Sequence, residues 1–136
     1  MCDTGEMEQR TDAWVVIPAY NEAPVIGGVV TGVRAAFPHV LVVDDASSDD
    51  TAAIARSAGA YTATHPLNLG QGAALQTGFE AALARGARYV VTFDADGQHD
   101  PADAAAMVDR AREEDLAFVL GSRFLDGVPS QVGSLK

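Results

Sequence analysis

The stretch AWVVIPAYNEAPVIGGVVTGVRAAFPHVLVVD, residues 13–44, decides the fold, because it joins two strand-like runs through one amphipathic helix. Residues 13–18 and 40–44 are short, continuous apolar runs, which are typical of strands buried on both faces. Between them an apolar residue recurs every four positions, at Val25, Val29, Val33 and Phe37. That spacing predicts a helix, which Pro24 can begin and Pro38 can end. Strand, helix and strand in this order predict two parallel strands of one sheet.

The same alternation continues along most of the chain. Further strands are predicted at residues 61–64, 89–94 and 118–121, and further helices at about residues 50–57, 71–85 and from 101 onward. The resulting order, βαβαβαβαβ, predicts an α/β fold with a mostly parallel sheet and helices on both faces. In such sheets ligands bind beyond the carboxyl ends of the strands. The residues that follow each strand are therefore the candidates for function.

The composition excludes several classes of protein. The 136 residues, 48% apolar and 21% charged, fit one soluble globular domain. A formal charge of −10 would repel a phosphate backbone, so nucleic acid is not an expected partner. Cys2 is the only cysteine, which excludes an intrachain disulfide, and no apolar run approaches the roughly 20 residues of a membrane span. The polar segment 1–12 lacks the apolar core of a signal peptide, so we expect a cytoplasmic protein.

Acidic residues gather after two of the predicted strands. Asp94 and Asp96, with Gln98 close by, offer the oxygen ligands that Mg²⁺ and Mn²⁺ prefer. The alternative is a loop that only caps the helix beginning at Pro101. Asp44 follows another strand and can accept hydrogen bonds from a base or a ribose. Here the alternative is that Asp45, Ser47 and Ser48 merely cap the next helix, and this alternative suits Asp45 better than Asp44.

Two further loops carry weaker signals. After the first strand, Tyr20 can stack on a base and Glu22 can accept hydrogen bonds from it, although a plain turn with Glu22 serving the helix dipole explains both residues. Residues 68–72, NLGQG, precede a helix, and a Gly-x-Gly there lets backbone N–H groups approach a phosphate. Since the third glycine of a dinucleotide fingerprint is missing, ordinary helix entry is the alternative.

Taken together, five stretches resemble the family-2 glycosyltransferases in order and spacing. They are WVVIPAYNEAPVIGGVV (14–30), VLVVDDASSDDTAAIA (40–55), HPLNLGQGAALQTGFEAAL (65–83), YVVTFDADGQHDPADAAAMV (89–108) and VLGSRF (119–124). Within that family the likeness is to the polyprenyl-phosphate sugar transferases, the class of dolichyl-phosphate mannose synthase. No single stretch is specific, but the ordered set is.

The resemblance implies the GT-A fold, with strand order 3-2-1-4, and inverting transfer from a nucleotide-diphospho-sugar of the GDP-mannose or UDP-glucose type. The acceptor it implies is polyprenyl phosphate or a saccharide, and the cofactor is Mg²⁺ or Mn²⁺. By position it assigns nucleotide contacts to Pro18, Tyr20, Glu22, Asp44 and Asp94, metal ligation to Asp94, Asp96 and Gln98, and a phosphate contact to Arg123. Of these, Asp96 and Arg123 are the expected catalytic residues.

Two departures from the family pattern shape the expected domain layout. Gln71 stands where many relatives have a basic residue, and relatives continue well beyond Lys136. The expected layout is a disordered segment at 1–12 and the donor-binding domain at 13–126. Because relatives continue further, we expect residues 127–136 to be the start of a truncated acceptor region. Such a chain would bind the donor and transfer sugar poorly.

Other classes and partners compete with this reading. A non-catalytic nucleotide-sugar-binding fragment is the main alternative. A signalling receiver domain needs a lysine that this chain has only at its last position, and a phosphatase would carry threonine where Gln98 stands. Peripheral association with the inner face of a membrane, and self-association through the truncated edge, are further alternatives for the partners.

Overall fold

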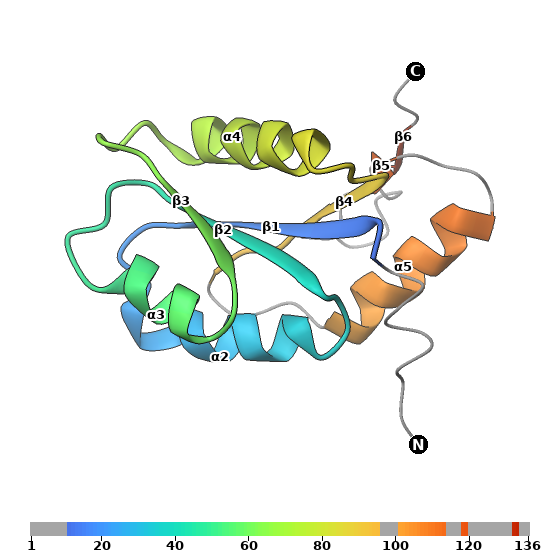
Figure 1. The fold of residues 1–136 in the computed structure, drawn as a ribbon, viewed down its shortest axis with the longest axis horizontal. Helices are drawn as coiled ribbons and strands as arrows, with labels where there is room; N and C mark the ends of the chain where they lie inside the picture. The colour runs from blue at the N-terminus through green and yellow to red at the C-terminus, as the bar shows by residue number, and fades with distance from the viewer. Residues whose placement is uncertain (1–10, 96–100, 114–117, 120–131, 134–136) are drawn as a thin grey trace.

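The computed structural model describes residues 11–95, 101–113, 118–119 and 132–133 (Figure 1). Its main sheet has four parallel strands in the order β3-β2-β1-β4. The strands are β1 (Ala13–Ala19), β2 (His39–Asp44), β3 (Tyr61–Thr64) and β4 (Tyr89–Thr92). The helices are α2 (Ala23–Arg34), α3 (Thr51–Ser57), α4 (Gln71–Ala84) and α5 (Pro101–Glu113). The α/β fold and the strand order 3-2-1-4 predicted from the sequence are confirmed.

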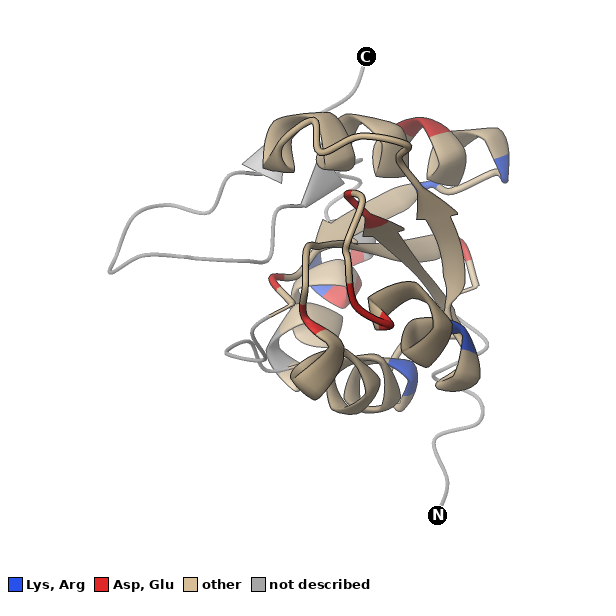
Figure 2. Cartoon of the chain, turned by 90° about the vertical axis from the view of Figure 1, so that its left-hand side faces the viewer, with Lys and Arg blue, Asp and Glu red and all other residues tan. Residues whose placement is uncertain are grey.

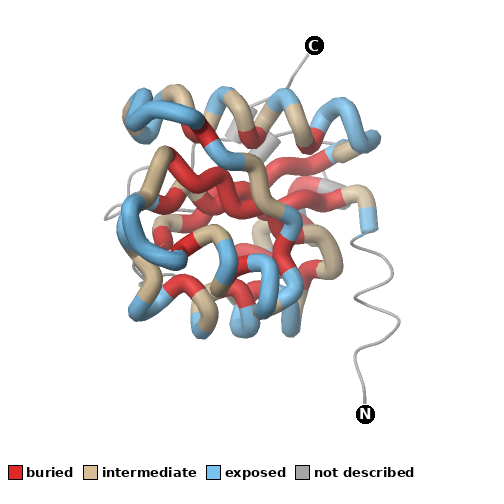
Figure 3. Tube along the Cα trace, turned by 60° about the vertical axis from the view of Figure 1, so that its left-hand side comes forward, coloured by how far each residue is buried: buried red, intermediate tan, exposed pale blue. Residues whose placement is uncertain are grey.

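Helices cover both faces of this sheet (Figure 1). Successive side chains of a strand point to opposite faces, so Val15 and Ile17 join the core beneath α2, α3 and α5, while Trp14 and Val16 face α4. Figure 3 shows β1, β2 and β4 as an almost continuous buried layer, with exposed residues on the outer sides of the helices. Burial on both faces explains why these three strands are nearly continuous apolar runs in the sequence.

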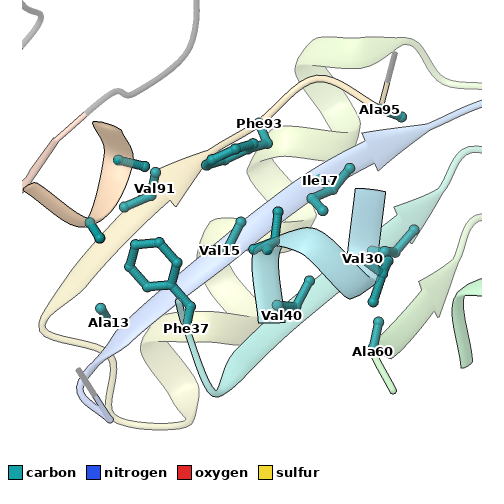
Figure 4. Close-up of a cluster of buried hydrophobic side chains, with 14 of the residues drawn as sticks. Ala13, Val15, Ile17, Val30, Phe37, Val40, Ala60, Val91, Phe93 and Ala95 are labelled. Atoms are coloured by element: carbon teal, nitrogen blue, oxygen red, sulfur yellow. The ribbon is translucent and has the colours of Figure 1, made fainter. Parts of the chain in front are cut away.

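The larger core lies on the side of α2, α3 and α5. Figure 4 shows Val15, Ile17, Phe37 and Val91 among the side chains gathered there. All four are completely buried, and burying each such side chain stabilises the fold by about 1.5–3 kcal/mol. This core fixes the strands relative to one another. It thereby also fixes the positions of the residues at the ends of the strands.

Some details differ from the sequence prediction. The fifth strand, β5 (Phe118–Val119), pairs antiparallel with β6 (Val132–Gly133) in a separate two-stranded ladder. The sequence gives no periodic signal for β6, because two residues are too few to show one. The segments predicted at 1–12 and 127–136 fall almost entirely outside the described residues. None of the described helices is long and apolar enough to span a membrane.

Candidate functional site

The neighbouring strands β1, β2 and β3 end in register with one another, at their carboxyl ends. Ala19 of β1 is the register partner of Asp44 in β2, and Asp44 is in turn the partner of Thr64 in β3. Figure 2 looks onto this edge and shows acidic residues in the loops that leave it. The loops after β1, β2 and β3 therefore begin side by side.

Reciprocal hydrogen bonds join the loop after β1 to the loop after β2. The backbone N–H of Asn21 donates to Ser47 Oγ (2.7 Å), and the backbone N–H of Ser48 donates to Asn21 Oδ1 (2.8 Å). The N–H of Glu22 donates to Thr51 Oγ1 (2.9 Å). These bonds fix the short segment that carries Tyr20 and Glu22 against the segment that follows Asp44.

Asp44 ends β2 and is buried, with 4% of its surface exposed. Its Oδ1 accepts a hydrogen bond from the backbone N–H of Ser47 (3.0 Å). Among the described residues, no donor reaches its other carboxylate oxygen. A ligand at this edge can therefore use that oxygen as an acceptor.

The residues predicted for the first loop lie next to Asp44 along the sheet edge. Pro18 is the register partner of Val43, and Tyr20 follows β1 directly with 48% of its surface exposed. Glu22 occupies the N-cap position of α2, but its side chain makes no capping hydrogen bond. A side-chain cap of α2 thus does not account for Glu22, which follows β1 two residues after Tyr20.

The predicted metal ligands are only partly within the described residues. Asp94 is partly buried and stands two residues beyond Thr92, the last residue of β4 and the register partner of Val16. The N–H of Phe93 still donates to the carbonyl of Val16 (3.1 Å), so β4 keeps its place beside β1 up to the residue before Asp94. Asp96, Gln98 and Arg123 lie outside the described residues.

The interpretation of Asp45 as a cap of the next helix is wrong. Its carboxylate instead accepts hydrogen bonds from His65 Nδ1 (2.8 Å) and from the backbone N–H groups of Leu69 (2.9 Å) and Gly70 (2.8 Å). The start of α3 is stabilised by Asp49, whose Oδ1 accepts a hydrogen bond from the backbone N–H of Thr51 (3.0 Å). Burial raises the pKa of Asp45, but the three hydrogen bonds and the nearby imidazole outweigh it and hold that pKa below its usual range.

The same bonds change the interpretation of residues 68–72. Two of the backbone N–H groups expected to approach a phosphate, those of Leu69 and Gly70, already donate to Asp45. Gly70 has a φ of 100° and stands at the N-cap of α4, which is a conformation that favours glycine. The stretch is thus a helix entry bound by an internal carboxylate, and those two groups do not serve a phosphate.

His65 is a part of this edge that the sequence reasoning missed. It is 8% exposed, and its Nε2 lies 2.8 Å from Thr77 Oγ1 on α4. The only signal in the sequence is its position immediately after β3, equivalent to that of Asp45 after β2. Since its partners are 20 and 12 residues away in the chain, no local pattern points to them.

Comparison with known proteins identifies the family. Residues 14–133 match the sequence pattern described as glycosyl transferase family 2, so the chain belongs to that family. The resemblance seen in the sequence is confirmed.

Several relatives act on polyprenyl-type phosphates by name. Polyprenol monophosphomannose synthase of Mycolicibacterium smegmatis is 36% identical over 127 residues, covering 88% of this chain and 47% of that protein. UDP-N-acetylglucosamine–dolichyl-phosphate N-acetylglucosaminyltransferase of Methanococcus voltae is 33% identical over 128 residues, covering 81% of this chain and 51% of that protein. The chain spans about half the length of the curated relatives it matches.

A solved structure is similar in fold. Glucosyl-3-phosphoglycerate synthase from Mycobacterium tuberculosis, in complex with Mg²⁺ and uridine diphosphate, superposes with a TM-score of 0.62 at 27% identity. The match covers 80% of this chain and 43% of that one. It supports the GT-A fold predicted from the sequence.

Proposed function

We propose that this chain forms the donor-binding part of an inverting glycosyltransferase that moves a sugar from a nucleotide-diphospho-sugar to polyprenyl phosphate. The observation that carries the proposal is the hydrogen-bonded junction of the loops after β1 and β2, which brings Tyr20, Glu22 and Asp44 to one edge. That edge is where ligands bind in parallel α/β sheets. Membership of glycosyl transferase family 2 supplies the reaction class.

The nucleoside is proposed to lie against the ends of β1 and β2. The half-exposed ring of Tyr20 offers a face for stacking, and the second carboxylate oxygen of Asp44 can accept an N–H from the base. Glu22 adds a further acceptor and Pro18 a rigid apolar wall. The donor is of the GDP-mannose or UDP-glucose type.

The diphosphate is proposed to lie toward β4. Asp94, Asp96 and Gln98 supply oxygen donors, which fit Mg²⁺ or Mn²⁺ and not a thiolate-seeking metal. Within the described residues no group of three or more acidic, histidine or cysteine side chains could hold a metal, so the set depends on Asp96 and Gln98 beyond them. When bound, the cation supplies positive charge that stabilises the leaving nucleoside diphosphate. Arg123 is proposed to contact the same phosphates.

The acceptor is inferred from relatives alone. Several act by name on dolichyl, polyprenol, dodecaprenyl or undecaprenyl carriers. Since such a carrier is a lipid, the reaction would take place at the cytoplasmic face of a membrane, with the protein associated peripherally. Binding of the donor without transfer is the alternative function, and an assay for lipid-linked sugar separates the two.

Calorimetry tests the donor site directly. We expect Mn²⁺ to bind the chain weakly alone and more tightly with GDP or UDP, because phosphate oxygens complete its coordination and the coupling is reciprocal. Asp94→Asn and Asp96→Asn should abolish the gain. Glu80→Gln, a charge-matched control on α4, should not, because Glu80 pairs with Gln76 on an exposed helix surface. Mn²⁺ binding that is unchanged by Asp96→Asn would contradict the proposed metal ligands.

Radiolabelled GDP-mannose and UDP-glucose with polyprenyl phosphate then test transfer. Formation of lipid-linked sugar that Asp96→Asn abolishes would support the glycosyltransferase. Donor binding without any product would support the alternative of a donor-binding chain.

A further inference from the structure

Every polar atom of Asp45 makes a hydrogen bond. Its backbone N–H donates to the carbonyl of Ala19 (2.9 Å), and its backbone carbonyl accepts from Asn68 Nδ2 (3.3 Å). Its two carboxylate oxygens accept the three bonds from His65, Leu69 and Gly70 described above. This one residue therefore connects the end of β1, the end of β2 and the loop that follows β3.

His65 extends the connection to α4. Its Nδ1 carries the proton that is donated to Asp45, because a carboxylate can only accept. In the neutral ring Nε2 is then an acceptor, which suits the hydroxyl of Thr77 at 2.8 Å. The backbone N–H of His65 also donates to the carbonyl of Asp44 (2.9 Å), the residue proposed to contact the base.

We propose that Asp45, His65 and Thr77 are positioning residues that fix the nucleoside end of the donor site. The bonds from Asp45 to Ala19 and from His65 to Asp44 fix both polar groups of the peptide that follows Asp44, and so the backbone that carries the Asp44 carboxylate. This inference rests on the proposed function, since it assumes that the edge carrying Asp44 binds a nucleoside.

Helix packing alone does not explain the network. Apolar contacts already hold α4 on the sheet, through the buried residues Ala74 and Ala82 against Trp14, Val16 and Val90. Burying a carboxylate is costly unless all of its bonds are present, and apolar residues commonly serve as well for stability. A fully satisfied polar network, in contrast, fixes one geometry, which is what a binding edge requires.

Thr77→Val is the main test, because it keeps the shape of the side chain and removes only the bond to His65. We expect the dissociation constant for GDP or UDP to rise roughly three- to tenfold, as for one lost hydrogen bond. Thr77→Ser should restore wild-type affinity. Asp45→Asn, which places an amide N–H₂ against N–H donors, should weaken binding more. Glu80→Gln on the same helix is the control and should bind like the wild type.

Nitrogen-15 NMR of the imidazole distinguishes positioning from general stability. The wild type should show a proton on Nδ1, and Thr77→Val should shift the Nε2 signal while the thermal midpoint changes little. A shifted Nε2 signal with unchanged nucleotide affinity in both Thr77→Val and Asp45→Asn would overturn this inference alone. A wild-type chain that binds neither nucleotide would overturn the proposed function, and this inference with it.

Discussion

Gly78 of α4 approaches Val16 of β1 so closely that a Cβ on the glycine would overlap Val16 Cγ1. Real contacts of this kind are longer than 3.0 Å, so the strand or the helix would have to move. We expect Gly78→Ala to lower the free energy of unfolding by about 1–3 kcal/mol, as for overpacked cores. Urea denaturation of the variant and the wild type measures the difference.

Gly28→Ala is the matched control for this prediction. Gly28 lies within α2, and a Cβ there meets nothing within 4 Å. The change should raise the free energy of unfolding by up to about 1 kcal/mol, because alanine is the better helix former. If both variants were equally stabilised, the close contact between α4 and β1 would be wrong.

Ala46 has a φ of 67°, a left-handed conformation that an alanine rarely adopts. The turn at this position lets Ser47 donate to the Asp44 carboxylate. Ala46→Gly should remove the backbone strain and raise the free energy of unfolding by about 0.5–1 kcal/mol. Ala35→Gly is the control, because Ala35 has an ordinary right-handed φ of −65° and should lose stability. Destabilisation by both changes would contradict the conformation of the turn.

The decrease in the free energy of unfolding at acid pH should depend on Asp45. Burial raises the pKa of this carboxyl, but its hydrogen bonds with Leu69, His65 and Gly70 prevail and lower it below the unfolded value. The carboxylate therefore stabilises the fold above the unfolded pKa of about 4, and that contribution is lost as the pH falls through the lower folded pKa.

Urea titrations at a series of pH values from neutral to acid measure this dependence. Asp45→Asn should be less stable than the wild type at pH 7, and the difference should shrink as the pH falls. A constant difference across the series would show that the charge of Asp45 contributes nothing.

The fold could be predicted from the sequence because both faces of the sheet are buried. That burial makes β1, β2 and β4 nearly continuous apolar runs. The edge strand β3 has the sequence YTAT and is exposed or partly buried, so its signal is weak, yet it was predicted with the bounds Tyr61–Thr64 that the structure has. The C-terminal end of α2 was less well predicted than its start, since the helix ends at Arg34 and not beside Pro38. Beyond Arg34, the backbone N–H groups of Ala36 and Phe37 still donate to the carbonyl of Val33. These bonds keep Phe37 in the four-residue apolar spacing, so that the spacing continues past the end of the helix.

Only those parts of the candidate site that lie at the ends of predicted strands could be predicted from the sequence. The position of Asp44 at this edge was predictable because Asp44 is the last residue of a predicted strand. The role of Asp45 was not, because its partners His65, Leu69 and Gly70 are at least 20 residues away and are brought to it by the sheet. Choosing between a helix cap and a loop anchor needs that three-dimensional arrangement.

Tyr20 and Tyr61 allow a matched test of base stacking. Their exposed fractions are nearly equal, 48% and 49%, but Tyr20 follows the carboxyl end of β1 and Tyr61 begins β3 at the opposite edge. Tyr20→Ala should weaken binding of GDP or UDP by about 1–3 kcal/mol, the usual contribution of an aromatic ring stacked on a base. Tyr20→Phe keeps the ring and should keep most of the affinity.

Tyr61→Ala is the control for the same calorimetric titration. Its ring lies 5.3 Å from that of Trp14 and beneath the guanidinium of Arg85, at 5.8 Å, so its removal should lower stability slightly. Nucleotide affinity should stay at the wild-type value, because no ligand is expected at the amino ends of the strands. Equal losses of affinity in Tyr20→Ala and Tyr61→Ala would mean that stability and not stacking is being measured. An unchanged affinity in Tyr20→Ala would contradict the proposed position of the nucleoside at the end of β1.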